Sequence, residues 1–164
     1  MTTPDIESVL REHGPMLLRM AAAYRSQRTG TDELAQEMAV AVWQALPRFR
    51  GEGSLKGFVA RVAQFTALDR LRVANARNEI GIDDLAIESV ESTPEAYAET
   101  SQKRRDLMRA VRSLPTGQRE CVLLVLEGFG NNEIADILGV AANTVDQRLS
   151  RARVWLRGQL EGSK

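Results

Sequence analysis

The sequence predicts an all-α protein with two small helical domains joined by an acidic flexible linker, the C-terminal domain being a helix-turn-helix. Three observations predict it. The 164 residues contain only 5 prolines and 12 glycines, while strong helix formers abound. Apolar residues recur at helical spacing through most of the chain. Hydrophobic residues make up 43% and charged residues 27%, a composition typical of globular chains.

The charges are divided unevenly along the chain, although they sum to zero. Residues 1–78 carry 11 basic and 8 acidic side chains (11 − 8 = +3), and residues 103–164 carry 11 and 7 (11 − 7 = +4). Residues 79–102 contain 7 acidic side chains and no basic one. Two basic blocks flanking an acidic connector suit a nucleic-acid-binding protein better than the net charge suggests. We expect domains at 1–78 and 101–164, with a linker at 79–100.

Three helices are expected in the first domain. Apolar spacing predicts a helix over residues 5–25, with a possible break at Gly14-Pro15. A second helix is expected from Thr31, as N-cap, to about Leu46, before Pro47. After a loop at 49–54, Ser54 is expected to cap a third helix over 55–76.

Four helices are expected in the second domain. The first runs from near Pro94 to Leu114, and Pro115 ends it. Thr116 is expected to cap the next, through Leu126. Asn131 or Asn132 is expected to cap a short helix that ends at Leu138-Gly139, and the last helix covers about 142–160.

The segment from Asn132 to Arg153 has the residue types of a helix-turn-helix. Ala135 is small where two helices cross, and Gly139 suits a left-handed cap. Val140 points back to the core, and an apolar stripe follows on the second helix. The opposite face presents Asn143, Thr144, Gln147, Arg148 and Arg151. Such a helix can enter the major groove of DNA; the alternative is a helical hairpin with a solvated polar face.

This region resembles the second conserved domain of the extracytoplasmic-function sigma factors of the sigma-70 class. The resemblance rests on Leu114-Pro115, Gln118-Arg119-Glu120, the apolar run 122–126, Gly128 and Arg151-Ala152-Arg153. It implies that the domain reads the minus-35 promoter element and touches the polymerase flap. The implied minus-35 residues are Asn143, Thr144, Asp146, Gln147, Arg148, Arg151 and Arg153.

The first block resembles the first conserved domain of the same family. Residues 32–37 match the acidic helix that docks on the polymerase clamp, which implies Asp32, Glu33, Gln36 and Glu37 as polymerase-binding residues. Residues 49–52 match the loop that captures a flipped minus-10 base, and residues 67–72 match the helix that follows. The implied minus-10 residues are Phe49, Arg50, Gly51, Arg61, Phe65, Arg70 and Arg72.

Each of these features has a simpler interpretation as well. Phe49 is either part of a base-capturing pocket or a core aromatic that anchors its loop. The acids at 32–37 also suit any helix N-terminus, and the arginines also suit a solvated surface. The acidic linker is either a tether or a mimic of nucleic acid.

Three residues depart from the family pattern. Phe65 stands where asparagine is common, and Phe58 replaces a tryptophan. Asp146 stands where a basic residue is common on the recognition helix. Because a carboxylate repels phosphate but accepts a hydrogen bond from cytosine, we hypothesise a changed minus-35 preference or weaker binding.

The predicted function is that of an RNA polymerase sigma factor, which directs promoter recognition, local DNA melting and transcription initiation. A two-domain regulator that acts without polymerase is the alternative. An enzyme is not expected, because we find no catalytic residues, metal ligands or cofactor motif. His13 is interpreted as structural, and Cys121 as a buried apolar residue.

The expected partners follow from the same resemblance. They are core RNA polymerase, promoter DNA and an anti-sigma factor. No cofactor and no small-molecule substrate is expected. Because no signal peptide and no apolar run of membrane-spanning length is found, we expect a cytoplasmic protein without membrane insertion.

Overall fold

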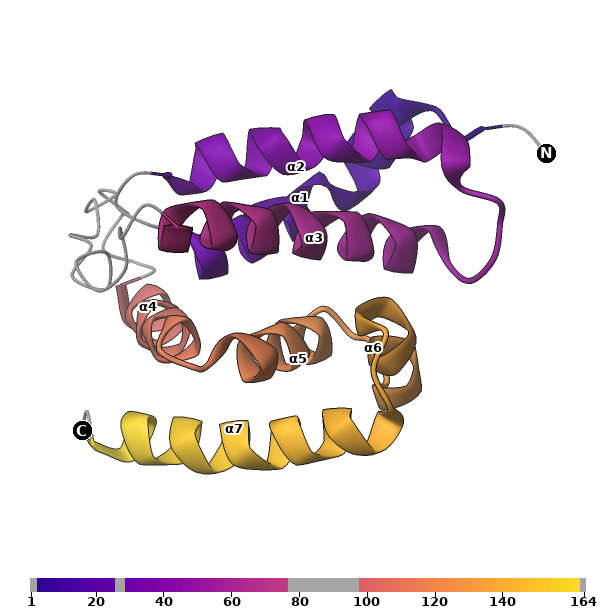
Figure 1. Ribbon diagram of the computed structural model, residues 1–164. Coiled ribbons are helices and arrows are strands. Elements are labelled where there is room, and N and C mark those ends of the chain that lie inside the picture. The colour runs from indigo at the N-terminus through magenta and orange to yellow at the C-terminus, as the bar shows by residue number, and fades with distance from the viewer. Residues whose placement is uncertain (1–2, 26–28, 77–97, 163–164) are drawn as a thin grey trace.

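The computed structural model describes residues 3–25, 29–76 and 98–162, and side chains within 74–76 and 98–101 are not described. The helices are α1 (Ile6–Tyr24), α2 (Thr31–Ala45), the short 3₁₀ helix η1 (Leu46–Arg48), α3 (Leu55–Ala76), α4 (Ala98–Arg112), α5 (Thr116–Leu126), α6 (Asn131–Leu138) and α7 (Ala142–Gly162). Figure 1 shows α1–α3 as one layer and α4–α7 as a second layer beneath it. The predicted all-helical fold with two helical regions is confirmed.

The N-terminal unit (α1–α3) surrounds a core to which each helix contributes one stripe. Fully buried side chains include Met20 of α1, Met38 of α2 and Val59 of α3. Small residues of α3 are also buried, among them Ala60 and Ala63, so that the helices approach closely. This packing fixes which face of α2 and of α3 is left for other contacts.

Helix α1 is continuous through Pro15, so the possible break at Gly14-Pro15 is wrong. A proline inside a helix leaves the carbonyl of the fourth residue before it without its hydrogen bond. Val9, Met16 and Met20 are buried on one face, before and after the proline. Their shared burial stabilises an uninterrupted helix.

The C-terminal unit (α4–α7) buries apolar side chains beneath its helix-turn-helix, and they belong to the same hydrophobic cluster as the core of α1–α3. Val111, Leu124, Ile134 and Val145 are all fully buried, one from each helix. The turn between α6 and α7 places Gly139 in the left-handed region, with φ of 69°. The N–H of Val140 donates to the carbonyl of Ala135 at 3.0 Å and closes the end of α6.

Three of the expected N-caps lie one residue or more too late in the sequence. Gly30, Pro115 and Gly130 occupy the cap positions of α2, α5 and α6, and Thr31, Thr116 and Asn131 are the first helical residues. Gly30 and Gly130 are extended, and none of the three residues forms a side-chain cap. At α6 the carboxylate of Glu133 instead accepts from the N–H of Gly130 at 3.3 Å. Ser54 caps α3 as predicted, since its Oγ accepts from the N–H of Gly57 at 3.0 Å.

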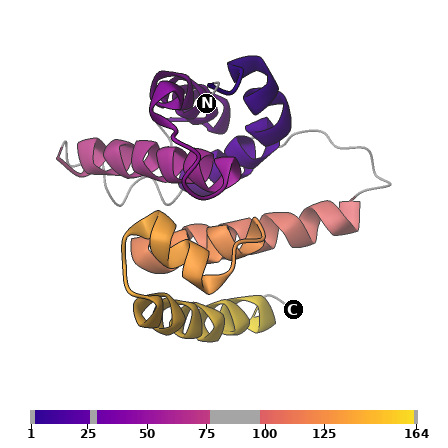
Figure 2. The ribbon, with the colours of Figure 1, turned by 90° about the vertical axis from the view of Figure 1, so that its right-hand side faces the viewer.

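The two units are in contact in both views. In Figure 2, turned by 90°, the helices of the C-terminal unit again lie beneath those of the N-terminal unit. Helix α1 contacts α4, and α3 contacts α6. The predicted linker at 79–100 lies outside the described residues except for 98–100, which belong to α4. Among the helices that the structure describes, none is long and apolar enough to cross a membrane.

Candidate nucleic-acid and polymerase interfaces

The exposed face of α7 is defined by residues one turn apart. Asn143, Gln147 and Arg151 are all exposed and follow one another at intervals of four, so they share one side of the helix. Val145, Leu149 and Ala152 are buried against the rest of the C-terminal unit. The buried stripe therefore turns the polar stripe outward along the N-terminal half of α7.

The other predicted minus-35 residues flank this face. Thr144 and Arg148 lie on one side and are partly buried, with Nη1 of Arg148 3.9 Å from a carboxylate oxygen of Glu120. Asp146 and Arg153 lie on the other side and are exposed. The structure thus brings Asn143, Gln147 and Arg151 into one row and places the remaining four predicted residues beside that row.

Asp146 has a partner within the protein. The side-chain amide of Asn131, at the start of α6, donates to its Oδ1 at 2.6 Å. This bond links the first residue of α6 to the second turn of α7, the two helices of the helix-turn-helix. The carboxylate is held in place beside the recognition face, where it adds negative charge.

Glu120 is a buried carboxyl beneath the same helix. Burial raises its pKa above the usual value, and the nearby charges of Arg148 and Arg119 oppose that shift. The next residue, Cys121, is also buried, and burial raises the pKa of its thiol. A high thiol pKa fits the predicted inert, apolar role of Cys121.

On α3, three predicted minus-10 residues lie on one exposed stripe. Arg61, Phe65 and Arg72 are exposed, and spacings of four and eleven residues place them within about 40° of one another around the helix. The guanidinium of Arg61 lies 5.6 Å from the ring centroid of Phe65, which is 56% exposed. This aromatic ring with a cation beside it suits stacking against an unpaired base.

Arg70 points to a different side of α3. It lies nine residues beyond Arg61, about 180° around the helix, and so faces α2. Its guanidinium forms a bidentate pair with the carboxylate of Glu37, with Nε 2.5 Å from Oε2, and lies 3.8 Å from Glu33. A predicted DNA-binding residue is therefore bound to two predicted polymerase-binding residues.

The loop between η1 and α3 has an anchored base and an exposed tip. Phe49 is partly buried, and its ring centroid lies 5.2 Å from that of Phe58. Arg50 and Gly51 are exposed, and Gly51 has a left-handed φ of 80°. The ring of Phe49 thus anchors the loop, and Arg50 stands at its tip, available for contact.

The acidic side chains of α2 are mostly exposed. Asp32, Glu33 and Gln36 lie at the surface of its first turns, and Glu37 is half-buried by its pair with Arg70. Val40 and Trp43 continue the surface of α2 and are 50% and 59% exposed. A surface with acids at one end and apolar groups at the other suits contact with another protein.

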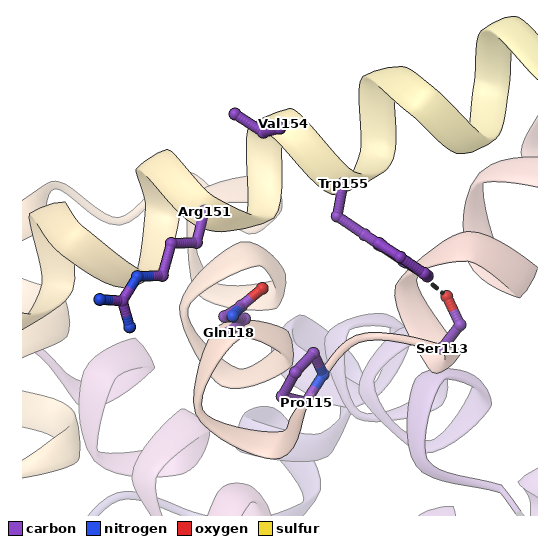
Figure 3. A pocket seen from close by; sticks show the side chains of 6 residues that line it. All are labelled: Ser113, Pro115, Gln118, Arg151, Val154 and Trp155. Atoms are coloured by element: carbon purple, nitrogen blue, oxygen red, sulfur yellow. Dashed lines mark hydrogen bonds between the residues drawn. The ribbon is translucent and has the colours of Figure 1, made fainter.

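The C-terminal unit also has a groove that no motif in the sequence predicts. It has a volume of about 360 Å³ and is lined by Ser113, Pro115, Gln118, Arg151, Val154 and Trp155. Figure 3 shows Trp155 of α7 reaching toward Ser113, with its Nε1 donating to the Ser113 Oγ at 3.0 Å. One sequence feature could have predicted this groove. Val154 and Trp155 lie off the buried stripe of α7, which leaves two large apolar side chains exposed.

Comparisons with known proteins assign both units. The family model for sigma-70 region 2 matches residues 9–77, and the model for sigma-70 region 4 matches residues 104–156. The extracytoplasmic-function RNA polymerase sigma-E factor of Salmonella typhimurium is 31% identical over 132 residues, 74% of this chain and 69% of the relative. This chain belongs to the extracytoplasmic-function sigma factors of the sigma-70 family. It directs transcription initiation and is not an enzyme.

Two further matches extend over nearly all of this chain. The sigma factor SigE of Mycolicibacterium smegmatis is 28% identical over 163 residues, and the match covers 96% of this chain and 62% of the relative. The solved sigma factor RpoE of Bartonella quintana, in complex with the anti-sigma factor NepR, superposes with a TM-score of 0.76 at 26% identity. That superposition covers 96% of this chain and 98% of RpoE. Family membership decides against the alternative of a regulator that acts without polymerase.

Proposed function

We propose that this sigma factor reads the minus-35 element with α7 and the minus-10 element with α3 and the loop before it, while α2 docks on core RNA polymerase. The observation that carries the proposal is the exposed row of Asn143, Gln147 and Arg151 above a buried core. Amide side chains pair with adenine, and arginine pairs with guanine in the major groove. In this row Asn143 and Gln147 supply side-chain amides and Arg151 supplies a guanidinium, on an α-helix that fits the major groove.

For the minus-10 element we propose a division of roles between aromatic and basic groups. Phe65 offers an exposed ring to an unpaired base, and Arg61 and Arg72 contact the phosphates beside it. Arg50, at the loop tip, is the fourth group of this surface. Arg70 contributes by holding α3 against α2 through Glu37.

We also propose that an anti-sigma protein regulates this sigma factor in the cytoplasm. Two solved relatives of similar fold, RpoE with NepR and CnrH with the cytosolic domain of CnrY, are complexes of that kind. The exposed apolar residues Trp43 and Trp155 give such a protein one anchor on each unit.

Run-off transcription with purified core polymerase tests the main proposal. Across genomic fragments, the holoenzyme is expected to start at defined sites that share two sequence elements. If no fragment gave a defined start, the proposed function would be wrong.

Gln147→Ala tests the recognition face. It is expected to relax discrimination at one minus-35 base pair by about 1–3 kcal/mol. Gln159→Ala is the matched control, since Gln159 is exposed on the distal part of the same helix. It should leave the promoter preference unchanged; equal effects of the two variants would contradict the assignment.

A further inference from the structure

Arg148 of α7 lies outside the outward row of the recognition helix (Asn143, Gln147 and Arg151). Successive residues of an α-helix are about 100° apart, so Arg148 lies about 100° around α7 from Gln147, the middle residue of that row. The side chain of Arg148 is only 31% exposed, whereas the three residues of the row are all exposed. The guanidinium therefore lies against the protein, beside the row.

One face of α5 receives this guanidinium. Gly117, Glu120 and Cys121 follow one another at spacings of three and one, which places Glu120 and Cys121 three and four residues after Gly117, side by side on the helix. The Nη1 of Arg148 lies 3.9 Å from Oε2 of the buried Glu120, and the Arg148 side chain forms a hydrogen bond with the sulfur of Cys121. We call these three residues of α5 the α5 contact face.

Gly117 leaves the space that the guanidinium occupies. A Cβ built at Gly117 would lie 3.0 Å from both Cζ and Nε of Arg148 and 3.4 Å from its Nη1. Gly117 is the second residue of α5, a position at which alanine would favour the helix more than glycine does. The close approach of Arg148 gives a physical reason for a glycine at this position.

A second contact attaches the same side of α7 to the end of α4. Trp155 lies seven residues beyond Arg148, within about 20° of it around the helix. Its Nε1 donates to the Oγ of Ser113 at 3.0 Å (Figure 3). All of these contacts lie within the C-terminal unit. Two attachments along one side of a helix oppose rotation about its axis, and such a rotation would redirect every residue of the outward row.

We propose that Arg148 is a positioning residue for minus-35 recognition. Its guanidinium, held by Gly117 and Glu120, fixes the rotation of α7 and hence the direction in which the outward row meets the base pairs. The proposal rests on the proposed function, and it replaces the direct DNA contact that the family resemblance implies for Arg148. A base-reading arginine affects one base pair, and a phosphate-binding arginine affects all sequences alike. A positioning residue affects every base pair that the row reads.

The test uses the full chain with core polymerase. Run-off transcription is compared across promoters in which each minus-35 base pair is substituted in turn. Arg148→Ala is expected to lower discrimination by roughly fivefold or more at several neighbouring base pairs, whereas Gln147→Ala lowers it at one. In promoter-binding titrations of the holoenzyme, Arg148→Ala should leave the salt dependence unchanged. Loss of a phosphate contact would instead lower the logarithmic salt slope by about one.

Two variants in α5 test the contact without changing α7. Gly117→Ala displaces the guanidinium and should reproduce the Arg148→Ala pattern, but it should have no further effect when Arg148→Ala is already present. Glu120→Gln removes the charge that attracts the guanidinium, so it should lower discrimination at the same base pairs. Its stability in urea should not fall, because a neutral amide is easier to bury than a carboxylate. A purely structural role would instead lower recognition and stability together.

Arg157→Ala is the matched control, since it removes the same side chain from an exposed position on the distal part of α7 and should leave discrimination unchanged. The positioning role is overturned if Arg148→Ala relaxes a single base pair or lowers the salt slope by about one. It is also overturned if Gly117→Ala and Glu120→Gln leave discrimination unchanged.

A failure of the proposed function has a different result. In that case the wild-type holoenzyme shows no preference at any minus-35 base pair. Urea unfolding of Gly117→Ala, Arg148→Ala and the double variant then still tests the contact. Non-additive changes in the free energy of unfolding support a guanidinium held against Gly117, and additive changes overturn it.

Discussion

Gly139, between α6 and α7, sets the direction in which the recognition helix leaves the turn. Its φ of 69° is costly for any residue with a Cβ. A Cβ built there meets no atom within 4 Å, so the cost of Gly139→Ala is conformational and involves no steric collision. We expect a loss of about 1–2 kcal/mol in the free energy of unfolding, which corresponds to roughly 4–15 °C in the melting temperature of a unit of this size.

Gly158→Ala is the matched control for that prediction. Gly158 lies inside α7, and an added Cβ there also meets no atom within 4 Å. Its backbone is helical, so alanine should stabilise the protein by about 0.5–1 kcal/mol. Urea unfolding followed by circular dichroism measures both. A conformational cost at Gly139 is contradicted if Gly139→Ala is as stable as the wild type, or if the two variants shift stability in the same direction.

Three further predictions concern charged residues. Because the pKa of Glu120 is raised in the folded protein, the wild type loses stability as pH rises from about 4.5 through that pKa. The stability gained by Glu120→Gln should therefore grow over this range in urea titrations; a pH-independent difference would contradict it. Arg70→Ala leaves Glu37 without its bidentate partner and should lower the free energy of unfolding by about 1–2 kcal/mol. This is less than the cost of breaking a fully buried ion pair. The exposed Arg72→Ala should stay within about 0.5 kcal/mol in the same unfolding assay. Asp146→Arg should tighten minus-35 binding and steepen its logarithmic salt dependence by about one to two units, in binding titrations at several salt concentrations. Unchanged affinity and sequence preference would remove Asp146 as a determinant.

The helices were predictable because their signals are local. Apolar spacing of 3.6 residues located each one, and Ser54 was identified as a cap because its side chain does the capping. The caps at Gly30 and Gly130 were missed because an extended glycine can occupy that position without a side-chain bond. Pro15 was misleading because its local penalty is outweighed by burial on both sides of it, which is a tertiary effect.

The recognition face was predictable for the same reason, and the contact between the units was not. Asn143, Gln147 and Arg151 are related by helix geometry alone, so the sequence places them together. Arg19 and Glu127 are 108 residues apart, and no periodic pattern links them. In the sequence, Arg19 and Glu127 each have the pattern of an ordinary surface charge, and only the packing of one unit on the other brings them together.

The arginines of α3 are sorted by helix phase. Arg61 and Arg72 are eleven residues apart, which brings them back to nearly the same side of the helix, and both are exposed. Arg70 precedes Arg72 by only two residues, about 200° around the helix, and that difference turns it to the acids of α2. One family motif therefore contains two kinds of basic residue. Loss of Arg70 should weaken polymerase docking and minus-10 contact together, because Arg70 holds α3 against the proposed polymerase-docking helix α2. Loss of Arg72 should weaken the DNA contact alone.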